Sequence, residues 1–199
     1  MSVASQAKRT ASVSRGTKET KVTVELLLDG SGRADIATGL PFLDHMLTAL
    51  CLHSRIDLVL HAQGDVHVDD HHTVEDCALT LGQAIDEALG KRTGITRFAH
   101  AYAPLDEALC RAVIDLSGRP CAVIEVPFRR EMLGSVATEN LVHFLQSLAT
   151  RARMALHVDL LRGDNDHHKA EAAFKAVALA LRAAVKLDDG AMPSTKGVL

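Results

Sequence analysis

The chain contains one unusual six-residue pattern twice. "DHHTVE" occupies Asp70–Glu75 and "DHHKAE" occupies Asp166–Glu171. Two other pairs of segments recur in the same order, "LDGSGR" at 28–33 with "IDLSGR" at 114–119, and "LDHML" at 43–47 with "LVHFL" at 141–145. Their offsets of 86 and 98 residues, against 96 for the histidine pattern, differ only where loops absorb the change, notably around "FRREMLGSVA". The chain is therefore expected to be an internal duplication whose halves share one fold.

The first half reads as three strands, a helix, a strand and a second helix. Thr- and Val-rich segments broken at Gly16 and at 29–32 predict the strands, and apolar residues at helical spacing predict a helix over 41–53. "RIDLVLHAQ" predicts a strand, and an apolar stripe predicts a helix that begins after Asp70, its N-cap, and ends near Gly90. We predict an α+β fold of two βββαβα halves, 10–93 and 94–199, with a pseudo-twofold relation and one integrated domain, after a flexible N-terminal arm at 1–9.

Composition argues against several classes of protein. Apolar residues make up 47% of the chain and charged residues 24%, as in a globular domain, and a net charge of −3 offers no general basic field for nucleic acid. The sequence has no apolar run of roughly eighteen residues, so no membrane span is expected. The four cysteines form no C-x-x-C pair, which favours reduced thiols and a cytoplasmic protein.

The duplicated pattern has the spacing of a metal site. On a helix, His71 and Glu75 lie one turn apart on one face, as do His167 and Glu171. An imidazole and a carboxylate so placed can both reach one ion. The sequence therefore predicts two metal ions, each bound by one pair together with a histidine from elsewhere in the protein.

Four more histidines complete the expected ligand set. His72 and His168 point roughly 100° away from their neighbours and are expected to cross over to the other site. With His45 and its repeat mate His143, the six histidines and two glutamates give three imidazoles and one carboxylate per ion. An octahedral metal would then keep open positions for a substrate, which favours catalysis over a structural role.

Several alternatives stay open at this point. A lone histidine on an apolar helix stripe, such as His45, is more often a hydrogen-bonded core residue, but matched sets in two copies are hard to obtain from core packing. Imidazole-rich sites suit Zn, Ni, Fe or Mn, and spacing does not choose among them. The ligands would also suit a dinuclear metallohydrolase, or a protein without enzymatic activity that stores or senses metal.

Longer motifs surround the histidines, and they resemble one family. These are "GLPFLDHML", "GDVHVDDHHTVEDCALTLGQA", "RFAHAYAPLDEAL", "DLSGRP", "RGDNDHHKAEAAFKAVALALR" and "PSTKGVL". Together they resemble the imidazoleglycerol-phosphate dehydratase family over nearly all the chain past about Arg9. The resemblance implies a duplicated ribosomal protein S5 domain 2-like fold. It also implies a hydro-lyase of histidine biosynthesis that converts D-erythro-imidazole glycerol phosphate to imidazole acetol phosphate and water.

The resemblance also implies which residues act. It implies two Mn²⁺ ions per subunit, used to form an imidazolate of the substrate ring. One ion would be bound by His45, His71, Glu75 and His168, and the other by His72, His143, His167 and Glu171. Glu19 would be a mobile glutamate that moves the proton. The residues that would bind the phosphorylated imidazole substrate are Arg97, Arg119, Lys175, Ser194 and Lys196, together with Glu19.

Members of the family form a homo-oligomer of 24 subunits with octahedral symmetry and with metal sites at subunit contacts, and the resemblance implies the same here. Such an enzyme needs a base and a phosphate-binding set beside its metals. A storage protein needs neither. Glu19 and the basic residues therefore distinguish the two readings.

Overall fold

The computed structural model describes residues 8–188 and has the element order that the sequence predicts, in two copies. The first half consists of β1 (Thr10–Gly16), β2 (Thr20–Leu27), β3 (Ala34–Ala37), α1 (Pro41–Ser54), β4 (Asp57–Gly64) and α2 (His71–Leu89). The second consists of β5 (Phe98–Leu105), β6 (Ala108–Asp115), β7 (Cys121–Glu125), α3 (Thr138–Arg151), β10 (Ala155–Arg162) and α4 (Asp166–Ala184). A short hairpin, β8 (Met132–Leu133) and β9 (Val136–Ala137), is added before α3, inside the segment whose length differs between the repeats.

Strand pairing confirms the duplication. The two large sheets have the orders β1-β2-β4-β3 and β5-β6-β10-β7. In each, the first three strands pair antiparallel and the last strand pairs parallel to its neighbour. The predicted α+β fold of two βββαβα halves is therefore correct.

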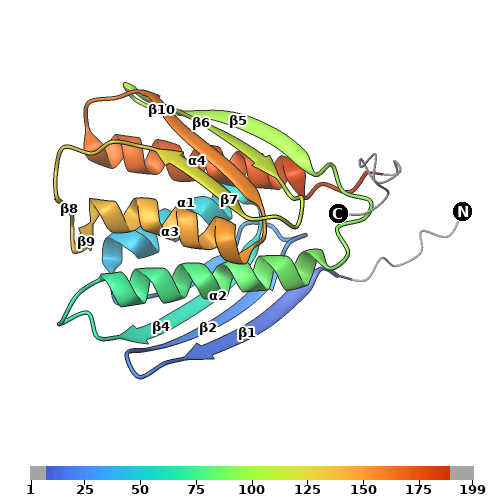
Figure 1. Ribbon diagram of the computed structural model, residues 1–199, viewed down its shortest axis with the longest axis horizontal. Helices are drawn as coiled ribbons and strands as arrows, with labels where there is room; N and C mark the ends of the chain where they lie inside the picture. The colour runs from blue at the N-terminus through green and yellow to red at the C-terminus, as the bar shows by residue number, and fades with distance from the viewer. Residues whose placement is uncertain (1–7, 189–199) are drawn as a thin grey trace, which may run out of the picture.

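The four α-helices of the described residues lie between the two sheets (Figure 1). α2 packs on β1 and β2, and α4 packs on β5 and β6. The helices also pair across the halves, α1 with α4 and α2 with α3. One continuous apolar core joins both halves, and within it the rings of Phe144 on α3 and Phe174 on α4 lie 5.7 Å apart.

The start of α2 differs in one detail from the prediction. Asp70 occupies the N-cap position, but its side chain makes no capping hydrogen bond. The Asp69 carboxylate instead accepts from the backbone N–H of His71 at 2.7 Å, and Asp70 accepts from the backbone N–H of Ala137 at 2.9 Å. Asp70 therefore fastens the β8–β9 hairpin to the helix, a long-range contact that local sequence does not reveal.

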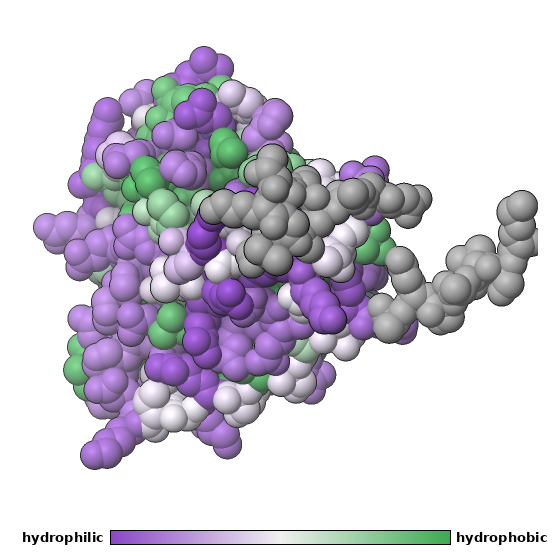
Figure 2. Space-filling model, turned by 45° about the vertical axis from the view of Figure 1, so that its right-hand side comes forward, coloured by the Kyte–Doolittle hydropathy of each residue, from purple (hydrophilic) through white to green (hydrophobic). Residues whose placement is uncertain are grey.

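The outer faces of the two sheets differ in character. Exposed apolar side chains on the β5–β6–β10–β7 sheet include Phe98, Tyr102, Val113 and Val123. Figure 2 shows hydrophobic side chains over the upper part of the view and a mostly hydrophilic surface below. Among the described residues, no helix is long and apolar enough to cross a membrane.

The arm predicted for residues 1–9 lies mostly outside the described residues. Arg9, its last residue, pairs with the Asp29 carboxylate at 2.5 Å and donates to the Val185 carbonyl at 2.7 Å. These contacts join the start of the chain to the end of α4.

Candidate metal centres

The cross-half helix pairs bring the predicted ligands together. His45 lies on α1 and meets His167 and Glu171 on α4, whereas His143 lies on α3 and meets His71 and Glu75 on α2. All of these positions fall in the N-terminal halves of their helices. Each group therefore combines a ligand from one half of the chain with two ligands from the other.

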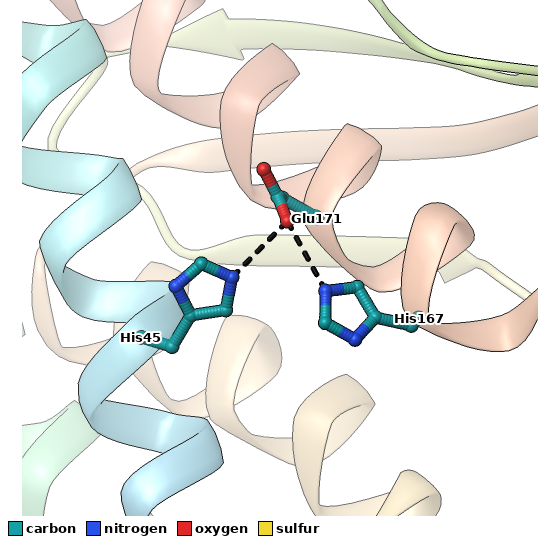
Figure 3. Close-up of side chains that lie close together, drawn as sticks. All are labelled: His45, His167 and Glu171. Carbon is teal, nitrogen blue, oxygen red and sulfur yellow. Dashed lines mark hydrogen bonds and ion pairs between the residues drawn. The ribbon is translucent and has the colours of Figure 1, made fainter.

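In the first group, which Figure 3 shows, both imidazoles point at one carboxylate. Glu171 Oε2 lies 3.1 Å from His45 Nε2 and 3.3 Å from His167 Nε2. The other oxygen, Oε1, lies 2.6 Å from Lys175 Nζ, one turn further along α4. Burial by itself would raise the pKa of Glu171, but the Lys175 ammonium and the two imidazoles lower it to about 2. This carboxylate is therefore ionised at neutral pH, as a metal ligand must be.

The second group has the same composition. His143 Nε2 lies 3.0 Å from Glu75 Oε1, and the rings of His143 and His71 stack with centroids 4.8 Å apart. Asn140, which is buried on α3, accepts a hydrogen bond from His71 Nδ1 at 2.9 Å. That bond leaves the opposite ring nitrogen of His71 for a ligand.

Both groups fit a divalent transition metal. In each, two imidazole nitrogens and one carboxylate oxygen lie within 4.8 Å of one another. These donors suit Mn, Fe, Ni or Zn, and their number leaves coordination positions for further ligands. In each group, a His-x-x-x-Glu pair lies beside a histidine from another helix, while the binding of a metal there stays a prediction.

The grouping implied by the resemblance is not found within one chain. It placed His45 with His71 and Glu75, but His45 lies beside Glu171, and His143 takes the place beside Glu75. The physical reason is the helix pairing, because α1 packs on α4 and α3 packs on α2. Spacing along the sequence could not reveal this choice between two equivalent histidines.

His72 and His168 lie outside both groups, as their angular position predicts. His72 Nδ1 is 3.1 Å from an oxygen of Asp65, and His168 Nδ1 is 2.7 Å from Glu107 Oε2. These hydrogen bonds raise the pKa of both histidines. Asp65 and Glu107 lie within two of the longer motifs, "GDVHVDDHHTVEDCALTLGQA" and "RFAHAYAPLDEAL", but neither the repeat nor helical spacing singled them out.

Glu19 lies in the exposed turn between β1 and β2. One of its carboxylate oxygens is 3.8 Å from His72 Nδ1. Hydrogen bonds to α2 hold the turn in place. The Thr20 hydroxyl donates to Asp76, a buried carboxylate on α2, and Arg15 donates to the same carboxylate at 2.6 Å. The structure thus places the predicted proton carrier next to a predicted metal ligand.

Of the predicted phosphate-binding residues that the structure describes, Arg97 and Arg119 lie away from these groups. The backbone N–H of Arg97 donates to the carbonyl of Ala184, at the C-terminal end of α4. Ala184 is thirteen residues from Glu171, which is about 20 Å along a helix. Arg97 is buried and pairs with Asp115 at 2.7 Å, and Arg119 is exposed in the turn after β6. Ser194 and Lys196 lie outside the described residues, and only Lys175 lies at a histidine group.

The fold and these groups define a class of protein, a duplicated α+β chain with two matched histidine–carboxylate centres of metal-binding composition. Residues 38–181 match the family model described as imidazoleglycerol-phosphate dehydratase. The chain belongs to this family, and it is an enzyme of the hydro-lyase class that acts in histidine biosynthesis.

Individual relatives agree with this assignment. The chain is 57% identical to the imidazoleglycerol-phosphate dehydratase of Acidiphilium cryptum over 96% of its own length and 99% of the relative's. A longer relative from Phytophthora nicotianae is also 57% identical, and the chain spans 42% of its length. The solved structure from Pyrococcus furiosus is 38% identical, with a TM-score of 0.82 over 94% of this chain and 100% of the other.

Proposed function

We propose that the chain dehydrates D-erythro-imidazole glycerol phosphate to imidazole acetol phosphate and water, with two manganese ions per subunit. The observation that carries the proposal is the pair of matched centres, His45 with His167 and Glu171, and His71 with Glu75 and His143. Two matched centres suit a substrate ring that has two nitrogens. A storage protein or a hydrolase has no comparable need for two matched centres. Relatives named imidazoleglycerol-phosphate dehydratase also cover almost the full chain.

Manganese bound at these centres would withdraw electron density from the imidazole ring of the substrate and so make the neighbouring C–H more acidic. The donor set accepts Mn²⁺, although affinity alone would favour Zn²⁺. The N-termini of α4 and α2 carry the positive ends of the helix dipoles, which repel a cation. The negative charges of Glu171 and Glu75 offset this repulsion.

We assign the proton transfer to Glu19. Its carboxylate is exposed and lies at the tip of a hairpin turn, 3.8 Å from His72 Nδ1, so it can reach a substrate next to that ring. A carboxylate in water-accessible surroundings can take a proton from one carbon and return it to another. Thr17 and Asp76 fix the base of the turn, while the Glu19 side chain itself is not held by a hydrogen bond in the described residues.

We propose that other subunits complete each centre. His72 and His168 lie outside their own groups, beside Asp65 and Glu107, and Arg97 and Arg119 lie near the opposite end of the molecule. A homo-oligomer of 24 subunits with octahedral symmetry would bring one subunit's histidines to another's centre. It would bring in the phosphate-binding residues as well, namely Arg97, Arg119, Lys175, Ser194 and Lys196. The exposed apolar side chains on the second sheet support further burial between copies.

We also propose that the enzyme works in the cytoplasm. Cys51, Cys77 and Cys110 are buried and free, and Cys121 is exposed and free. Burial raises the pKa of the three buried thiols to about 12, so they remain neutral and unreactive. This pattern suits a reducing compartment.

The test is to strip the protein of metal, restore it with Mn(II) or Zn(II), and follow imidazole acetol phosphate by its enol absorbance. We expect turnover with about two Mn per chain. Tight metal binding with no turnover from imidazole glycerol phosphate would contradict the proposal and favour a storage role.

A further inference from the structure

Two histidines of the duplicated pattern, His72 and His168, are held in the same way by residues that are not repeat mates. Each presents Nδ1 to a carboxylate, which is Asp65 for His72 at 3.1 Å and Glu107 for His168 at 2.7 Å. Asp65 follows β4, whereas Glu107 lies in the turn between β5 and β6. Duplication of one ancestral half therefore does not account for the shared contact.

A carboxylate at this distance fixes the tautomer of the ring. An ionised carboxylate can only accept a hydrogen bond, so the proton of the neutral imidazole must sit on Nδ1. The lone pair is then on Nε2, at the opposite edge of the ring. Within the described residues, neither Nε2 has a hydrogen-bond partner, although that of His168 lies 3.7 Å from the exposed Asp106. Nε2 is thus left for a cation.

Glu107 is well suited to hold His168 rigidly. Its Oε1 accepts from the backbone N–H groups of Asp164 at 3.0 Å and Asn165 at 2.8 Å, and its Oε2 accepts from the ring. Asn165 in turn caps α4 by accepting from the backbone of His167 and His168. One carboxylate therefore orients both the first turn of α4 and the His168 ring.

The two halves differ in how the first hairpin turn is used. In the second half, the turn carboxylate Glu107 is bonded to the histidine. In the first half, Asp65 takes that place, and the turn carboxylate Glu19 stays 3.8 Å from the ring, beyond hydrogen-bond distance. The substitution by Asp65 leaves Glu19 available for a different task.

We infer that Asp65 and Glu107 are positioning residues that fix the Nδ1–H tautomer of His72 and His168, so that each ring offers Nε2 to a metal ion shared with another copy of the chain. The inference rests on the proposed function. Carboxylates that accept from the second nitrogen of a ligating histidine orient the ring and make it a better donor, and their loss costs about 10- to 100-fold in metal affinity. Asn140 makes the corresponding contact to His71.

Glu107→Gln tests the inference because it keeps the shape and removes the charge, and Asp65→Leu tests it because leucine has a similar size and leaves His72 Nδ1 without an acceptor. In Glu107→Gln, the amide oxygen can still accept from Asp164 and Asn165, so the amide nitrogen faces the ring and donates to Nδ1. The proton then moves to Nε2 and blocks it. Glu125→Gln on β7, an exposed carboxylate with no assigned role, is the matched control.

The measurement is Mn(II) binding by electron paramagnetic resonance of the free ion, together with the thermal midpoint of the metal-free protein and turnover at increasing Mn(II). We expect each variant to bind the ion about 10- to 100-fold more weakly at an unchanged midpoint. Saturating Mn(II) should restore its turnover, as expected for a positioning residue. The control should match the wild type.

Other outcomes separate the two proposals. If the wild type binds two Mn(II) and turns over while both variants keep its affinity, the positioning roles are wrong and the proposed function stands. If affinity falls only in proportion to the midpoint of the metal-free protein, the residues are structural and the inference also fails. If the wild type neither binds Mn(II) nor turns over, the proposed function is wrong, and the inference is wrong with it.

Discussion

Glu19 and Asp57 illustrate two different uses of a carboxylate in this molecule. Glu19 is exposed in the β1–β2 turn, where the Thr17 hydroxyl accepts from the backbone N–H groups of Glu19 and Thr20 at 3.1 and 2.9 Å. Asp57 begins β4, and its Oδ1 accepts from the backbone of Ser31, Gly32 and Arg33 at 2.7, 2.9 and 2.9 Å. The first carboxylate can move, whereas the second holds the turn before β3.

Glu19→Gln should abolish most of the activity and leave metal binding intact. An amide cannot accept the proton, and general acid–base catalysis contributes about 10²- to 10⁴-fold to a rate. We expect kcat to fall by that order while Mn(II) content and affinity stay at the wild-type values. Steady-state kinetics and metal analysis of the same preparation provide the measurement.

Lys18→Gln is the matched control for Glu19→Gln, since it changes an exposed charge in the same turn. It should keep the wild-type kcat. Loss of metal together with activity in Glu19→Gln would show that the turn supports the centre instead of moving the proton.

Asp57→Asn should lower the free energy of unfolding by about 2 kcal/mol at neutral pH. Burial would raise the pKa of Asp57, but the three backbone N–H groups and the Ser31 hydroxyl lower it from 3.8 to about 2. A carboxyl with a lowered folded-state pKa stabilises the fold above the unfolded-state pKa, and this contribution is lost as the pH falls toward about 2.

Chemical denaturation of metal-free protein at pH 7 and at about pH 3 checks this prediction. The difference between wild type and Asp57→Asn should shrink at the lower pH. Glu25→Gln, at an exposed position on β2, should behave like the wild type at both. A difference that does not depend on pH would show that shape matters here and charge does not.

At the scale of elements, close packing of helices places the ligands. A Cβ atom on Gly82 of α2 would lie 2.8 Å from the Leu148 carbonyl oxygen and 2.9 Å from the Ala152 nitrogen, closer than real Cβ atoms approach. Glycine therefore lets α2 approach the C-terminal end of α3. That approach sets the distance between the helices that carry Glu75 and His143.

Gly82→Ala should destabilise the protein although alanine is the better helix former. The gain in helix propensity is about 1 kcal/mol, and forcing an atom against a neighbouring backbone costs about 1 to 3 kcal/mol. We expect a net loss of stability and a weaker centre at His71, Glu75 and His143. Urea denaturation and Mn(II) titration measure the two effects.

Glu87→Ala is the control on the same helix, because Glu87 is exposed and makes only a surface hydrogen bond to Gln83. It should change the stability by less than about 0.5 kcal/mol. A stabilised Gly82→Ala would mean that α2 and α3 can separate at no cost.

The order and type of the elements followed from the sequence. Periodic apolar residues predicted α1 and α2 to within a residue or two, and the repeat supplied their partners in the second half. The role of Asp70 was not predictable, because its carboxylate binds the backbone of Ala137, 67 residues away. The local sequence pattern predicts where a helix begins. Long-range contacts decide which side chain caps its backbone N–H groups.

At the scale of the whole molecule, the two ends carry different parts of the expected site. The histidine groups lie toward the N-termini of the four helices, and Arg97 lies at the C-terminal end of α4. Among the described residues, Arg97 and the histidine groups therefore do not meet within one chain. If His72 and His168 bind metal at contacts between copies, formation of the oligomer would depend on bound metal.

A chelator should break the assembly into smaller units at neutral pH, and Mn(II) should restore it. Protons compete with metal for Nε2. Since the pKa values of His72 and His168 are raised, acid should begin to weaken the assembly above the ordinary histidine pKa of about 6.5. Light scattering follows particle size, and circular dichroism checks that the subunits stay folded.

The double variant His72→Asn, His168→Asn should stay small even with Mn(II) present, while keeping its helix content. If neither the chelator nor these substitutions changes the particle size, the metals are bound within single subunits. Apolar contacts, such as those of Phe98 and Tyr102, would then hold the subunits together.

The sequence by itself determined the duplication, the α+β class and the spacing of each His-x-x-x-Glu pair, because all three depend on local periodicity and on self-similarity of the chain. Only the tertiary structure decided which histidine joins which pair. His45 and His143 occupy equivalent positions in their halves, and the packing of α1 on α4 and of α3 on α2 distinguishes them. The contacts of Asp65, Glu107 and Asn140 with the rings likewise come from distant elements or from loops outside the repeated six-residue pattern, where folding brings donor and acceptor within hydrogen-bond distance.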